Sequence, residues 1–162
     1  MQLRVLFGSI ALAAFAWRPA QPQTGASPDR IALIGTWQLD LGRTHYGKGV
    51  DRRRSEHMRC DVQGTSLDCS IESVRADGRK VSARFAAPIA GGRSPVLGLA
   101  DIDSVELRPQ FDGLVDATFS YRGQPRYAYR AYRGADGKSL FIVSIDPVTR
   151  AALTSLVVYR RR

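Results

Sequence analysis

The chain contains few of the residues from which metal centres and catalytic sites are commonly built. Among its 162 residues there are only two cysteines and two histidines. His45 and His57 are separated by a predicted loop and the start of a strand, so we interpret them as surface histidines. No His/Cys cluster has the spacing of a metal site, and neither a Gly-x-Ser-x-Gly motif nor a phosphate-binding glycine loop occurs. The sequence gives no support to an enzyme, and we expect no metal and no cofactor.

Long apolar runs are also scarce, and only the N-terminus carries one. Val5–Phe15 is uncharged and follows Arg4, and Ala14-Phe15-Ala16 suits a signal peptidase. The run is shorter than the ~20 residues of a membrane-spanning helix. We therefore predict a signal peptide over residues 1–16, with cleavage after Ala20 or a buried N-terminal helix as alternatives. We expect the mature protein to be secreted or periplasmic, without an integral membrane segment.

Residues 17–30 contain Pro, Gln, Ala, Ser and Thr, a composition typical of a flexible tether. We predict that a single domain follows over residues 31–162. Asparagine is absent, and 24 Lys+Arg outnumber 15 Asp+Glu, which gives a formal net charge of +9. This charge favours anionic ligands, polysaccharides or membrane surfaces, although a solvated arginine-rich surface has the same composition. Nucleic acid is not expected, because no recognised nucleic-acid-binding motif occurs in this exported chain.

The two cysteines fit one β-hairpin. A two-residue turn at Gly64-Thr65 with glycine first is typical of type II′ and places Cys60 opposite Cys69 at a non-hydrogen-bonded site. His57 then lies opposite Glu72 on the outer face. Three pairs share the inner face: Cys60–Cys69, Val62–Leu67 and Met58–Ile71. Because export implies an oxidising compartment, we predict a structural disulfide between Cys60 and Cys69.

Apolar residues alternate with polar ones between turn residues along most of the remaining chain, and no segment has sustained helical periodicity. We expect a first strand over Ile31–Leu41, a polar loop over Gly42–Arg54 and a looser segment over Pro88–Asp101. Many short strands at fairly even spacing favour an all-β fold. We predict an antiparallel up-and-down meander closed as a barrel of about eight strands, with a sandwich as the alternative.

A second predicted hairpin concentrates aromatic residues. A three-residue loop at Gly123–Pro125 would pair Tyr121 with Tyr127 and Phe119 with Tyr129. These four side chains then share the inner face, where they are candidates to line a ligand cavity. The filling of an ordinary core is the alternative interpretation.

The opening Gly35-Thr36-Trp37 resembles the first-strand Gly-x-Trp signature of lipocalins. The longer run Gly35–Tyr46, with Asp136–Leu140 and Val157–Tyr159, resembles small exported bacterial lipocalin-like (calycin-type) proteins, many of them without an assigned function. The Thr-Asp-Tyr motif of true lipocalins is absent. The resemblance implies that Trp37 packs at the closed end of the barrel under an arginine, in a structural role. It also implies a basic barrel-mouth loop that contains His45, Tyr46, Arg52, Arg53 and Arg54.

These observations together favour a binding protein over an enzyme. We expect an exported, monomeric, lipocalin-like barrel that holds a small apolar or anionic amphipathic molecule. Two alternatives stay open. One is a protein-binding module, such as an inhibitor of an envelope hydrolase, that uses the loop Gly42–Arg54. The other is a structural barrel with a filled core.

Overall fold

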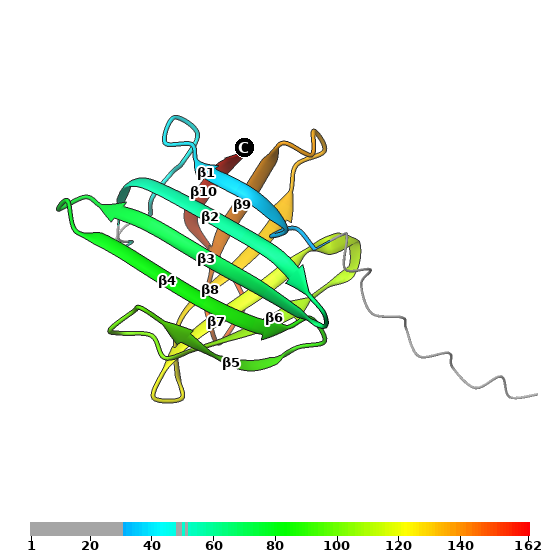
Figure 1. Cartoon of the computed structure of the whole chain (residues 1–162). Helices are drawn as coiled ribbons and strands as arrows, with labels where there is room; N and C mark the ends of the chain where they lie inside the picture. Colours follow the sequence, from blue (N-terminus) through cyan, green and yellow to red (C-terminus); the bar gives the residue numbers. More distant parts are fainter. Residues whose placement is uncertain (1–30, 48–49, 51) are drawn as a thin grey trace, which may run out of the picture.

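The computed structural model describes residues 31–47, 50 and 52–162, and within them ten antiparallel strands close into a barrel (Figure 1). Each strand pairs with its neighbours in the chain, and the first pairs with the last. The strands are β1 (Gly35–Leu39), β2 (Arg53–Gln63), β3 (Ser66–Arg75), β4 (Lys80–Pro88), β5 (Gly92–Leu97), β6 (Ser104–Pro109), β7 (Val115–Tyr121), β8 (Gln124–Arg133), β9 (Ser139–Ile145) and β10 (Ala152–Arg161). The predicted all-β antiparallel barrel is confirmed, but the predicted number of about eight strands was too low. The predicted signal peptide and tether lie outside the described residues.

Because neighbouring strands run in opposite directions, their connections gather at two ends of the barrel. We call one of them the Trp37 end; it carries residues 31–34 and the β2–β3, β4–β5, β6–β7 and β8–β9 connections. The β6–β7 connection includes the 3-10 helix η2 (Phe111–Gly113). The opposite end, which we call the Tyr46 end, carries the other five connections. No helix in the described residues is long and apolar enough to span a membrane.

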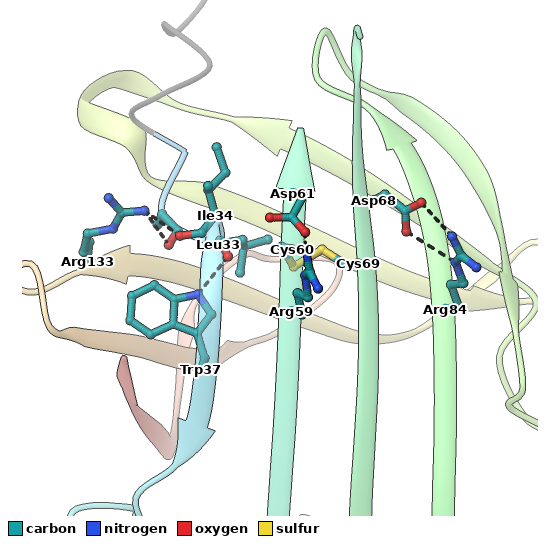
Figure 2. The surroundings of a disulfide bond; sticks show 11 residues. Leu33, Ile34, Trp37, Arg59, Cys60, Asp61, Asp68, Cys69, Arg84 and Arg133 are labelled. Carbon is teal, nitrogen blue, oxygen red and sulfur yellow. Dashed lines mark hydrogen bonds and ion pairs between the residues drawn. A yellow bond between two sulfur atoms is a disulfide. The ribbon is translucent and has the colours of Figure 1, made fainter. Parts of the chain in front are cut away.

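The cysteine hairpin forms as predicted. Cys60 on β2 and Cys69 on β3 are Cα partners 4.2 Å apart and are joined by a disulfide of 2.02 Å (Figure 2). Gly64 has a φ of +59°, which a type II′ turn requires at its first central position. The structure confirms the other predicted pairs of this register: Gln63–Ser66, Val62–Leu67, Met58–Ile71 and His57–Glu72.

The looser segment predicted over Pro88–Asp101 contains a strand, β5. Gly92 and Pro95 are unfavourable in a strand. Ser94 and Val96, however, are buried in alternation with exposed neighbours, as in a strand with one face inside. The strand is held mainly by β6, with four paired residues, whereas only Val96 and Leu97 have partners on β4. Tertiary pairing therefore overrides a weak local preference. The predicted first strand was too long, since β1 begins at Gly35 and ends at Leu39.

The predicted register of the aromatic hairpin was wrong. Phe119 pairs with Tyr127, and Tyr121 pairs with Gln124 across a two-residue turn. Arg122 (φ +50°) and Gly123 (φ +78°) both have positive φ, as a type I′ turn requires. This turn follows the twist of the strands, and an irregularity between Phe119 and Ser120 shifts the pairing that follows. The remaining inward pairs are Ala117–Tyr129 and Val115–Ala131.

Trp37 closes one end of the barrel interior. Its side chain is fully buried, and its indole N–H donates a hydrogen bond to the carbonyl of Leu33 at 2.8 Å (Figure 2). The guanidinium carbons of Arg133 and Arg161 each lie 5.8 Å from the ring centroid, which is a cation–π distance. Burial lowers the pKa of Arg133, and the charge of Arg161 adds to the decrease.

Arg133 also fixes the chain that precedes β1. Its Nη2 donates to the carbonyls of Ile31 at 3.2 Å and Ile34 at 2.9 Å. The amide of Ala32 donates to the carbonyl of Gly113, on the β6–β7 connection, at 2.8 Å. Residues 31–34 are therefore bonded across the Trp37 end to two distant parts of the sheet.

Candidate functional site

Aromatic side chains fill the middle of the barrel. Phe85 on β4 packs edge-to-face against Phe119 on β7, with ring centroids 6.0 Å apart. Phe119 in turn packs against Tyr129 on β8 at 5.8 Å. Two of the four predicted lining residues, Phe119 and Tyr129, therefore lie in the interior and contact each other.

The other two predicted lining residues lie at the Tyr46 end. Tyr127 is 47% exposed, and its hydroxyl donates to the carboxylate of Asp101 at 3.4 Å. Tyr121 adjoins the β7–β8 turn, where the guanidinium carbons of Arg122 and Arg126 lie 5.1 and 5.9 Å from its ring centroid. These two tyrosines belong to the rim rather than to the interior.

A charged cluster lies inside the barrel between the aromatic layer and the Tyr46 end. Nη1 of Arg53 donates to Oε1 of Glu56 at 2.9 Å and to the hydroxyl oxygen of Tyr159 at 3.1 Å. The hydroxyl of Tyr159 itself donates to the same Oε1. Glu56 and Tyr159 are 5% and 1% exposed. A carboxylate and a guanidinium are thus held together where little water reaches them.

Tyr46 completes this part of the interior. His45 and Leu156 form a β-bridge with two backbone hydrogen bonds of 2.8 Å, so the chain after β1 continues alongside β10. The bridge turns His45 outward, while Tyr46 is partly buried and packs against the core. Among the described residues, no group accepts a hydrogen bond from the hydroxyl of Tyr46 or from Nε of Arg53. The backbone amide of Arg53 approaches the Tyr46 hydroxyl oxygen and acts to lower the pKa of Tyr46.

Burial sets the protonation states in this region. It raises the pKa of Tyr159 well above its ordinary value, and the carboxylate of Glu56 adds to the increase. It also raises the pKa values of Tyr46 and Tyr129, against the effect of the Arg53 charge. Burial alone would lower the pKa of Arg53, but the Glu56 carboxylate raises it above its ordinary value. The tyrosines are therefore neutral hydroxyl donors and Arg53 is a permanent cation.

Arg75 brings a second positive charge to the same region. It is the Cα partner of Arg53 across β2 and β3, and its charge lowers the pKa values of Tyr46 and Tyr129. We call the residues that act on one another here the interior cluster: Tyr46, Arg53, Glu56, Arg75, Tyr129 and Tyr159. Arg53 is the cation of this cluster that contacts the buried Glu56 carboxylate.

The structure corrects the predicted barrel-mouth loop. Arg53 and Arg54 belong to β2, and the register of β2 with β3 shifts between Arg53 and Ser55. This irregularity places Arg53 inside the barrel, whereas Arg54 and Arg52 are exposed. Simple alternation could not find Arg53 and Glu56 as interior partners, because the shift breaks the two-residue period. The sequence analysis also missed Tyr159 and Arg75 as members of the cluster.

Two grooves lie on the outer face of the sheet. One, of about 390 Å³, lies over β2, β3 and β4 and is lined by Ser55, His57, Glu72, Ser73, Val74, Lys80, Val81 and Ser82. The other, of about 210 Å³, lies over β1–β3 and shares His57 and Glu72 with the first. Neither opens into the interior cluster.

No protein-family model matches the chain, and neither a curated protein nor a solved structure shows significant similarity to it. Within the described residues, no group of three or more His, Cys, Asp and Glu side chains is placed to hold a metal ion. The interior cluster is the feature of the described residues whose geometry and charge point to a function.

Proposed function

We propose that this protein is an exported, lipocalin-like binding protein whose barrel holds a small anionic amphipathic molecule. The head group binds at Arg53 and Tyr46, and the apolar part lies against the aromatic layer of Phe85, Phe119 and Tyr129. The observation that carries the proposal is the permanent cation Arg53 inside the barrel, whose Nε donates to no acceptor among the described residues and which lies beside the neutral hydroxyl of Tyr46.

Energetics distinguish this cluster from an ordinary filled core. Replacing a buried ion pair by apolar residues of similar volume is often neutral or stabilising, so stability alone does not require Arg53 and Glu56. A buried polar group without a partner costs about 1–3 kcal/mol. Both costs are offset if an anionic ligand accepts hydrogen bonds from Nε of Arg53 and the hydroxyl of Tyr46.

The chemistry of the site favours an anion over a cation or a neutral molecule. The free hydrogen-bonding capacity of Arg53 is a donor, and the neutral Tyr46 hydroxyl also donates. The permanent positive charge of Arg53 makes a bound cation unfavourable. Charge-assisted hydrogen bonds to a carboxylate, phosphate or sulfate are about twice as strong as neutral ones. An aliphatic tail can pack against the aromatic layer, which lies on the side of the cluster away from the Tyr46 end.

Titration calorimetry with dodecanoate, dodecanol and dodecyltrimethylammonium tests the proposal. We expect dodecanoate to bind most tightly. Arg53→Gln should weaken it about tenfold or more, since a hydrogen bond to a charged group contributes about 1.5–3 kcal/mol. Arg54→Gln is the matched control, because Arg54 is the exposed neighbour on the same strand. Failure of dodecanoate to bind, or equal losses in the two variants, would contradict the proposal.

Tyr46→Phe separates a ligand-binding role from a structural one. Because the buried Tyr46 hydroxyl donates to no acceptor among the described residues, its removal should change stability little. Dodecanoate binding should nevertheless weaken about fivefold, the value of one neutral hydrogen bond. Unchanged binding in Tyr46→Phe, measured beside its urea unfolding curve, would remove this residue from the site.

A further inference from the structure

Large apolar side chains are exposed at the Tyr46 end, the end of the barrel nearest the interior cluster. One is Leu41 in the β1–β2 connection, and four others lie on β5, β8, β10 and the β9–β10 connection. Val148 is 81% exposed, Leu97 66%, Leu153 50% and Tyr127 47%. Leu97 is the last residue of β5, Val148 lies in the β9–β10 connection, and Leu153 is near the start of β10. Tyr127 is near the start of β8. Each therefore lies in a connection or close to a strand end.

These side chains follow an arc along one side of the rim. The hydroxyl of Tyr127 contacts Asp101, in the β5–β6 connection that begins just after Leu97. Ala128, next to Tyr127, pairs with Ile145, the last residue of β9 before the connection that contains Val148. In Figure 1, β5 and the β7–β8 turn accordingly project from the same region of the barrel. We call Leu97, Tyr127, Val148 and Leu153 the rim arc.

Two exposed arginines lie within this arc. Arg122 and Arg126, on the β7–β8 hairpin, both approach the ring of Tyr121. The nearby acids on the β5–β6 and β9–β10 connections include Asp101, Asp103 and Asp146. Asp101 accepts a hydrogen bond from the hydroxyl of Tyr127, and Asp103 and Asp146 accept hydrogen bonds from backbone amides of Arg122 and of Val148 and Thr149. The carboxylates are thus turned to the chain, while the guanidinium groups face outward. Exposed apolar side chains together with tyrosine and arginine are typical of protein surfaces that bind the headgroup region of a membrane.

We propose that the rim arc docks the Tyr46 end onto an anionic membrane surface. Val148, Leu97 and Leu153 would enter the interfacial region, and Arg122 and Arg126 would meet lipid phosphates. This inference rests on the proposed function, because it explains how an amphiphile of low solubility in water reaches the interior cluster. The formal net charge of +9 favours approach to such a surface. Separate tips on several connections suit a fluid bilayer better than the flat face of a protein partner.

Flotation with vesicles tests the docking. Intact mass is measured for each purified variant to verify that all variants begin at the same residue. Vesicles contain phosphatidylcholine alone or phosphatidylcholine with phosphatidylglycerol. We expect binding to the anionic vesicles, and a loss of at least tenfold in the double variant Leu97→Ser/Val148→Ser, because both side chains lose the burial of apolar surface in the membrane interface.

The opposite end of the barrel provides matched controls. Phe111 is 81% exposed, as Val148 is, but lies in η2 at the Trp37 end, so Phe111→Ser should leave vesicle binding unchanged. Arg122→Gln/Arg126→Gln should weaken binding about fivefold per charge removed. The control Lys138→Gln/Arg160→Gln, with exposed cations at the Trp37 end, should have no comparable effect. Circular dichroism and urea unfolding verify the fold of each variant.

The outcomes separate docking from ligand binding. Absence of vesicle binding, or equal losses in the rim and Trp37-end variants, overturns the docking proposal while dodecanoate binding can stand. Capture of a protein partner that depends on the rim arc, without vesicle binding, also overturns it. Vesicle binding that depends on the rim arc, in a protein that does not bind dodecanoate, supports docking and contradicts only the proposed function.

Discussion

Loss of the disulfide between Cys60 and Cys69 should destabilise the barrel by an amount that the structure allows to be worked out. The two cysteines are nine positions apart and both fully buried. In the chain-entropy model, such a link removes about 9 cal/mol/K of entropy from the unfolded chain. This corresponds to about 2.6 kcal/mol near room temperature. For a domain of this size, the midpoint of thermal unfolding should fall by about 8 °C.

Reduction and mutation separate the cross-link from the packing of its sulfur atoms. A reductant breaks the bond but leaves both sulfurs in the core, so the free energy of unfolding should fall by about 2.6 kcal/mol. Cys60→Ala/Cys69→Ala also removes two buried sulfurs, each of which contributes roughly 1 kcal/mol of packing. The double variant should therefore be less stable than the reduced protein.

Urea unfolding of the oxidised, reduced and double-alanine proteins, followed by circular dichroism, measures both effects. The double-alanine protein serves as the control for the reductant, because it should not respond to it. A difference between the oxidised and reduced proteins below about 1 kcal/mol would refute the reasoning. It would mean that the Gly64-Thr65 turn already holds the two strands together in the unfolded chain.

The Trp37 end and an outer ion-pair network give further predictions. Arg133→Met should cost about 1–3 kcal/mol in urea unfolding, because it removes donors from buried carbonyls, whereas Arg161→Met should cost under about 1 kcal/mol. Similar losses of stability in Arg133→Met and Arg161→Met would contradict the view that hydrogen bonds from Arg133 hold residues 31–34 across the Trp37 end. Asp116, 5% exposed, accepts hydrogen bonds from Arg130 and lies 2.9 Å from a guanidinium nitrogen of Arg150. Burial opposes the change, but these arginines hold the pKa of Asp116 below its ordinary value. Its contribution should be complete above about pH 4 and lost as the pH falls through the lowered pKa. Asp116→Asn should therefore cost about 1–3 kcal/mol at neutral pH, and its stability should vary less with acidity than that of the unmodified protein.

Predictions from the sequence were correct where the local patterns agreed with one another. At the cysteine hairpin, turn chemistry, alternation and the cysteine pair all specified one register, and the structure has that register. At the aromatic hairpin, Gly123-Gln124-Pro125 suggested a three-residue loop. The left-handed backbone of Arg122 is uncommon for a residue other than glycine, and no pattern around it signals the shorter turn.

The candidate site was predicted only in part for a related reason. Phe119 and Tyr129 follow strict alternation, and both lie in the interior. Arg53 does not follow it, because the shift in register between Arg53 and Ser55 turns a residue of a basic run toward Glu56. The pairing of Glu56 with Tyr159 joins residues 103 positions apart. One sequence carries no local signal for a contact of that kind.

Closure of the barrel through β1 and β10 has a consequence for the order of folding. Trp37 pairs with Arg161, so the last seam cannot form until nearly the whole described chain is available. The intervening strands can pair one hairpin at a time, because each new strand adds to the edge of the sheet that has already formed. Until β10 pairs with β1, both edge strands of the sheet expose unpaired backbone amides and carbonyls. The chain is then most vulnerable to joining another copy of itself, and sealing of the final seam removes both edges at once.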